Sequence, residues 1–131
     1  MTPPALTKEN SATIGFVVAC LFAKAIDKDE MHAWADHIFA TTDSCPSYLV
    51  DVSTFDEPLF HISRVIGFVP VSGLSDSEQV ALVGIAFLRG RDQFEPAPTR
   101  EQAVSALATH QHLVTRFRET FPFIIFDYDH A

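Results

Sequence analysis

The spacing of apolar residues between Asp27 and residue 39 constrains the fold of this chain most strongly. Five of them occupy the i, i+3, i+4, i+7 and i+8 positions of one helical face: Met31, Trp34, Ala35, Ile38 and Phe39. Asp27 precedes this run and Glu30 follows three residues later, which is the pattern of a helix-capping box. Asp29, His32 and Asp36 fall on the opposite face. The segment therefore predicts an amphipathic helix that packs on a core through its Trp34 face.

Helix signals recur along the rest of the chain. Capping residues, helix-opening prolines and apolar spacing predict further helices over residues 10–26, 44–52, 58–66, 75–88 and 99–120. Gly67 should end the fourth helix of the chain, and Ser75 with Glu78 forms a second capping-box pattern. Residues 123–126 fit either a short strand or a tucked-in tail. The sequence predicts a single all-α domain over residues 1–131, with five or six helices, a possible short C-terminal strand and a loose start over residues 1–9.

Two predicted helices, over residues 10–26 and 75–88, are apolar almost all round, which indicates burial on most sides. Each carries a glycine in its middle, Gly15 and Gly84, where another helix could approach closely. The apolar run of residues 12–23 is too short for a membrane span of about 20 residues. Lys8 and Glu9 before it also lack the net positive charge of a signal peptide. A buried helix of a cytoplasmic protein is the expectation.

Charge is distributed unevenly over the 131 residues, whose net charge is −8. Residues 1–26 have a net charge of +1, residues 27–63 of −7 and residues 64–131 of −2. Eight carboxylates lie in the middle segment: Asp27, Asp29, Glu30, Asp36, Asp43, Asp51, Asp56 and Glu57. A negative field of this kind repels nucleic acid and anionic lipid and accelerates encounter with a basic partner. Helix capping and solubility are the alternative explanation for these acids.

Metal-ligand patterns are weak. His32 and His37 are five residues apart, so they diverge on a helix, whereas paired ligands are typically four apart. His110 and His112, two apart on the predicted helix over 99–120, should diverge as well. The acidic terminus with Asp127, Asp129 and His130 is better explained as an exposed tail. Cys20 and Cys45 have neither metal-ligand spacing nor the number that a disulfide framework needs, which favours a reducing compartment. The sequence predicts no metal.

Catalytic patterns are equally sparse. The chain has no phosphate-binding glycine loop, so no nucleotide cofactor is predicted. The segment 73–77 begins like a nucleophile elbow but lacks the closing glycine, and a helix cap explains it better. Cys45 could meet a distant histidine in space, although nothing in the sequence favours this. The sequence predicts no cofactor and no enzyme.

Several segments together resemble a known family. They are residues 14–23 (IGFVVACLFA), Trp34, residues 48–51 (YLVD), residues 55–60 (FDEPLF) and residues 66–68 (IGF). In pattern and character, over roughly residues 12–90, they are similar to immunity proteins of bacterial contact-dependent growth inhibition systems. No single motif of the family fixes the binding residues.

The resemblance implies a cytoplasmic protein that binds the C-terminal toxin domain of a secreted effector and blocks its activity. Many such toxins are nucleases with basic clefts, which an acidic inhibitor would fit. Charge alone points to the eight carboxylates between Asp27 and Glu57 as the toxin-binding residues. Two alternatives remain open: a small cytosolic enzyme that uses His32, Asp36, Asp56 or His61 as acid–base groups, and a regulatory adaptor protein.

Overall fold

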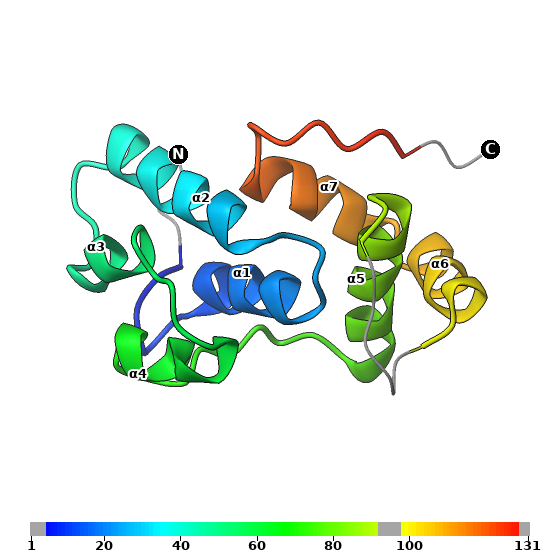
Figure 1. Ribbon diagram of the computed structural model, residues 1–131, viewed down its shortest axis with the longest axis horizontal. Coiled ribbons are helices and arrows are strands. Elements are labelled where there is room, and N and C mark those ends of the chain that lie inside the picture. Colours follow the sequence, from blue (N-terminus) through cyan, green and yellow to red (C-terminus); the bar gives the residue numbers. More distant parts are fainter. Residues whose placement is uncertain (1–4, 92–97, 129–131) are drawn as a thin grey trace. The chain divides into compact units, whose positions relative to one another are not determined.

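The computed structural model describes residues 5–91 and 98–128 and is helical, as the sequence predicts. These residues contain seven α-helices, one 3-10 helix and no strand. In chain order they are α1 (Ala12–Phe22), α2 (Lys28–Thr41), α3 (Tyr48–Val52), η1 (Leu59–His61), α4 (Ile62–Ile66), α5 (Asp76–Leu88), α6 (Arg100–Thr109) and α7 (His112–Thr120) (Figure 1). The sequence allows either a short strand or a tail over residues 123–126. These residues form a turn and an irregular stretch, and no strand.

Contacts divide the chain into two compact units. Unit 1 consists of the residues up to Phe22 together with Asp27–Gly73, and unit 2 consists of Ala23–Ile26 together with the residues from Leu74 onward. Unit 1 thus contains α1 to α4, and unit 2 contains α5 to α7. The single domain that the sequence predicts stays a prediction.

Helix α1 is shorter than predicted. It ends at Phe22 rather than near Ile26, because Lys24 adopts a left-handed backbone conformation with φ of 65° that no helix can continue through. Ile14, Phe16 and Cys20 are fully buried, as the apolar sequence of this helix indicates. None of the helices in the described residues has both the length and the hydrophobicity that crossing a membrane requires.

Helix α2 begins where the sequence predicts. The Asp27 carboxylate accepts a hydrogen bond from the backbone N–H of Glu30, and the Glu30 side chain accepts one from the backbone N–H of Asp27. Trp34 is 1% exposed and leads a buried stripe. Phe39, however, is 39% exposed, so its predicted place in the core is wrong. It lies at the edge of the stripe, where the apolar face of the helix meets solvent.

A loop, rather than the helix that the sequence predicts, approaches Gly15 of α1. A Cβ atom at Gly15 would lie 2.6 Å from the backbone of Val71 and Ser72, which follow α4 and belong to no helix. The hydroxyl of Ser11 accepts a hydrogen bond from the backbone N–H of Val71 at 2.8 Å. Residues 5 and 6, within the start that was expected to be loose, are held: the Tyr48 hydroxyl donates to the carbonyl of Leu6 at 2.6 Å, and Leu6 itself is buried. Residues 1–4 lie outside the described residues.

Unit 2 is built on α5 and α6, which lie side by side (Figure 1). Gly84 is the point of closest approach, because a Cβ atom there would overlap the carbonyl group of Ala103. Both helices begin with complete capping boxes, formed by Ser75 with Glu78 and by Thr99 with Gln102. The close contact that the glycine predicted on α5 is therefore confirmed.

The prediction of one long helix over 99–120 is wrong. Helix α6 ends at Thr109, and His110, with φ of −126° and ψ of 51°, turns the chain before α7 begins at His112. This break lets Leu107, Leu113 and Phe117 all be buried. After α7, the guanidinium of Arg118 donates two hydrogen bonds to the carbonyl of residue 126, at 2.8 and 3.1 Å, which holds the C-terminal segment as a tucked-in tail.

Candidate functional site

Unit 1 gathers acidic side chains around Asp56. Two adjoining hollows share this residue. The first is lined by Asp27, Lys28, Asp29, His32 and Asp56, and the second by Asp51, Thr54, Phe55, Asp56, Glu57, Arg64 and Val65. We define the Asp56 surface as the five carboxylates that line these hollows: Asp27, Asp29, Asp51, Asp56 and Glu57. They come from the start of α2, from α3 and from the loop before η1.

Two of these carboxylates project into solvent. The side chain of Asp29 is 99% exposed and that of Asp56 is 93% exposed. Lys28 lies 3.9 Å from Asp56, and its ammonium group also stands 5.7 Å from the ring centre of Phe55. An exposed ion pair at this distance contributes little to stability. Asp29 and Asp56 are therefore available to an approaching partner.

Two other members of the Asp56 surface, Asp27 and Glu57, are partly engaged. Asp27 caps α2 through its side chain. Glu57 lies 3.1 Å from Nδ1 of His61 and 3.8 Å from Nη2 of Arg64. The loop that carries Asp56 and Glu57 is fixed by His32, whose Nε2 bonds to the carbonyl of residue 55 at 2.7 Å. Five carboxylates against Lys28 and Arg64 leave the surface negatively charged.

The remaining predicted toxin-binding residues are placed elsewhere. Glu30 serves the capping box of α2, and its Oε1 accepts from the backbone of Asp27 at 3.0 Å. In the part of the chain that the structure describes, Asp36 and Asp43 are exposed and line neither hollow. The structure thus concentrates five of the eight acids and leaves three outside.

The groups of the enzyme alternative do not converge on one centre. His32 and Asp56 line the same hollow, but His32 is committed to the carbonyl of residue 55. His61 pairs with Glu57, and Asp36 lines neither hollow. Cys20 is buried and Cys45 is half-buried, and neither takes part in a disulfide within the described residues.

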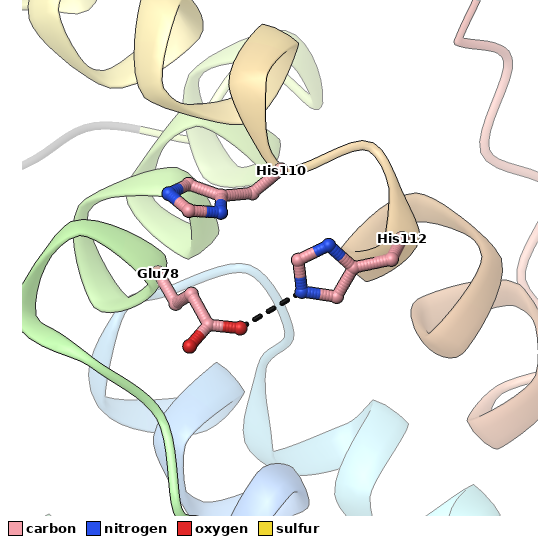
Figure 2. Close-up of side chains that lie close together, drawn as sticks. All are labelled: Glu78, His110 and His112. Carbon is pink, nitrogen blue, oxygen red and sulfur yellow. Dashed lines mark hydrogen bonds and ion pairs between the residues drawn. The ribbon is translucent and has the colours of Figure 1, made fainter.

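Unit 2 contains a second cluster, which the sequence analysis missed. One side-chain donor atom each from Glu78, His110 and His112 lies within 4.8 Å of the other two. Figure 2 shows the two imidazoles and the carboxylate facing a common point, with Nε2 of His112 2.8 Å from Oε2 of Glu78. Nε2 of His110 lies 3.0 Å from the hydroxyl of Ser77. Glu78 comes from the first turn of α5, and the histidines flank the junction of α6 and α7.

The expected divergence of His110 and His112 is therefore wrong. Residues two apart point to different sides of a continuous helix, but His110 ends α6 and His112 begins α7. Their rings meet edge to face with centroids 5.6 Å apart. The capping-box pattern did place Glu78 at a helix start, yet no sequence signal placed that start beside the α6–α7 junction.

Hydrogen bonds perturb the Glu78 carboxyl strongly. Its pKa is lowered from 4.5 to about 2, first because the backbone N–H of Ser75 donates to the carboxylate and second because His112 does. A carboxylate held in its charged form by fixed donors is already oriented toward a cation or a donor. The arrangement can bind a proton donor or a metal ion without reorganising Glu78.

Comparisons with protein families, with curated proteins and with solved structures give no match to this chain. The assignment of function consequently depends on the two clusters themselves.

Proposed function

We propose that this protein is an immunity protein that binds and neutralises a cognate toxin domain with a basic surface, such as a nuclease. The supporting observation is the gathering of five carboxylates around Asp56, two of them almost fully exposed. The proposal places the protein in the cytoplasm, where a nuclease toxin would meet its substrate. It predicts binding to another protein rather than catalysis or contact with nucleic acid.

The exposure of Asp29 and Asp56 determines how these residues act. Charges in contact with water contribute little to the stability of their own fold. They do raise the association rate with an oppositely charged surface, and they favour one orientation of the partner. Once covered by a basic cleft, the same carboxylates lose water and pair with arginine or lysine side chains. Their contribution then shifts from association rate to affinity.

The geometry also refines which acids carry this role. Asp27 and Glu30 are part of the α2 capping box, so replacing them would weaken the helix as well as any binding. Asp29, Asp51 and Asp56 are exposed members of the surface. We assign the main contacts to these three. Asp36 and Asp43 contribute only to the long-range negative field.

Calorimetry with the toxin domain encoded immediately upstream of this gene tests the proposal. Wild-type protein should bind this domain tightly, and more weakly at about 200 mM than at about 50 mM salt. The triple variant Asp29→Asn, Asp51→Asn, Asp56→Asn should lose about 10–1000-fold in affinity and most of the salt dependence, given the coupling energies of close interfacial charge pairs.

A matched control separates local contacts from total charge. The variant Asp36→Asn, Asp43→Asn, Glu119→Gln removes three exposed carboxylates outside the Asp56 surface. The affinity of this variant should fall by less than about threefold, because only the long-range attraction that accelerates association becomes weaker. Equal losses in both variants would remove the Asp56 surface from the proposal but keep the function. Absence of binding by the wild-type protein would overturn the immunity function itself.

A further inference from the structure

We propose that Glu78, His110 and His112 form a binding site for a divalent transition-metal ion, with Zn²⁺ as the ion that fits best. Two imidazole nitrogens and one carboxylate oxygen are ligands that Zn²⁺ takes in proteins, and three protein ligands leave its fourth position to water. This site lies in unit 2 and does not depend on the proposed function, whose residues lie in unit 1.

The distances require only small side-chain adjustments. In a tetrahedral zinc site with bonds of 2.0–2.1 Å, the donor atoms lie about 3.3 Å apart. Here the three donor atoms are within 4.8 Å of one another, and the Glu78–His112 pair is at 2.8 Å. An ion entering between them would replace the proton that now joins Nε2 of His112 to the carboxylate. The pair would open by a few tenths of an ångström, and His110 would move toward it.

Neighbouring groups already orient two of the ligands. The Ser75 N–H donates to Oε1 of Glu78 at 3.0 Å, which leaves Oε2 directed at His112. The hydroxyl of Ser77 bonds to Nε2 of His110, so Nδ1 is the nitrogen available to the metal. Hydrogen bonds of this kind to the outer atom of a ligand fix its orientation in metal sites. The ligands are therefore supported rather than merely adjacent.

The same cluster does not form a hydrolytic triad. Ser77 and His110 are at hydrogen-bond distance, but the carboxylate of the cluster bonds to His112 rather than to His110. The imidazole that would act as base thus lacks the acid that holds its tautomer in such a triad. Metal coordination gives each of the three side chains a role as a ligand, whereas a hydrolytic triad of Ser77 and His110 would give His112 no role.

A bound ion would join parts of unit 2 that are distant in sequence. Glu78 lies in the first turn of α5, and the histidines hold the turn between α6 and α7. Coordination would therefore stabilise this junction, in proportion to the logarithm of the free metal concentration. Binding requires neutral imidazoles and an ionised carboxylate, so it releases protons and weakens on acidification.

Titration of the chelator-stripped full chain with Zn²⁺, and with Co²⁺ as a spectroscopic probe, tests the site. We expect one ion per chain by calorimetry, a visible Co²⁺ spectrum of tetrahedral type, and a melting temperature higher by about 5–10 °C at a 100-fold excess of Zn²⁺ over the dissociation constant. Failure of wild-type protein to bind Zn²⁺ at micromolar concentration would overturn the proposal.

Variants locate the ion. Replacement of His110 and His112 by asparagine should abolish the Co²⁺ spectrum, whereas His37→Asn with His61→Asn, which removes two histidines of unit 1, should retain it. Glu78→Gln keeps the capping box, since glutamine serves at this position, but should lose at least the 10–100-fold in affinity typical of outer-shell changes. Stoichiometric binding that survives both the histidine pair and Glu78→Gln would place the metal elsewhere and refute the site.

Discussion

The two units resemble each other in how they pack and differ in how they hold their carboxylates. Each is packed on an apolar helix whose glycine, Gly15 or Gly84, accepts the backbone of another segment. In unit 1, Asp29 and Asp56 stand in solvent with few partners. In unit 2, by contrast, Glu78 is fixed by a backbone N–H and a histidine, and its side chain is only 21% exposed.

This difference separates two uses of the same functional group. Free carboxylates generate a field that acts over about a Debye length and tolerates many partner geometries. A carboxylate whose lone pairs are already directed has lost that freedom and instead selects a ligand by geometry. Under the two proposals, the carboxylates of unit 1 would attract a macromolecule, and Glu78 of unit 2 would coordinate a small ion.

Core truncation should give the largest effect and tests whether the two units are packed alike. Trp34→Ala in unit 1 and Phe117→Ala in unit 2 each remove a side chain that is 1% exposed or less. We expect each to lower the free energy of unfolding by about 3–5 kcal/mol in urea titrations. Phe60→Ala, at a side chain that is 75% exposed, should change it by less than about 0.5 kcal/mol. A cost well below this range in one unit would break the similarity in packing.

Substitution of Gly15 or Gly84 by alanine adds one methyl group at a close contact in each unit. It tests whether both contacts are equally tight. In Gly84→Ala the new methyl group overlaps the Ala103 carbonyl, and in Gly15→Ala it meets the Val71–Ser72 backbone at 2.6 Å. Because backbone must move in both cases, we expect losses of about 1–3 kcal/mol, even after the gain in helix propensity. Thr115→Ala, at an exposed position of α7, is the control and should be nearly neutral. A stabilised Gly→Ala variant would show that the close contact does not exist.

Loss of the helix caps should have a smaller effect on the free energy of unfolding. It also tests whether Asp27 serves the fold or the exposed surface of unit 1. Asp27→Ala and Ser75→Ala each remove a side chain that accepts from the N3 backbone of its helix. We expect each to cost about 1 kcal/mol in unfolding free energy, and Asp27→Asn to cost only a few tenths because asparagine also caps well. A neutral Asp27→Ala would mean that this carboxylate belongs wholly to the exposed surface of unit 1.

Local signals in the sequence predicted most helix starts and few of the tertiary contacts. The capping patterns at Asp27 and Ser75 and the predicted start at residue 99 each place the start of a helix correctly, because a cap is a contact between near neighbours. Gly67, with φ of 96°, ends α4 for the same local reason. The apolar spacing identified Trp34 as a core residue.

What the sequence did not predict depends on segments meeting in space. The turn at His110 interrupts an apolar pattern that a continuous helix also satisfies, so periodicity could not locate the break. The Glu78–His112 contact joins residues 34 positions apart, and no spacing rule addresses such a pair. The eight acids were grouped by their proximity in sequence, whereas the fold selects five of them around Asp56.

Acid titration of the metal-free protein isolates the fixed carboxylate of unit 2. The folded-state pKa of Glu78 is about 2, against 4.5 for the free side chain. Because the folded value is lower, Glu78 contributes stability that is complete above about pH 4.5 and lost as the pH falls through 2. Urea unfolding at pH values between 4.5 and 2 should show that the free energy of unfolding falls less steeply with pH in Glu78→Gln than in the wild-type protein. The capping box is retained in both proteins. Superimposable acid profiles would show that the carboxylate is not held as described.

Alkaline titration supplies the corresponding test in unit 1, with the opposite sign. Burial raises the pKa of Tyr48 from 10.0 to about 12, while its hydroxyl donates to the Leu6 carbonyl at 2.6 Å. A raised folded-state pKa means that the stability Tyr48 contributes is complete below pH 10 and lost as the pH rises toward 12. In Tyr128→Phe, which leaves Tyr48 as the one tyrosine, the phenolate absorbance should therefore rise near pH 12. A midpoint near 10 would show that Tyr48 is not buried against residue 6. The hydrogen bond from Tyr48 would then hold the segment around Leu6 less firmly than Glu78 is held in unit 2. The similarity in packing between the two units would fail at this contact.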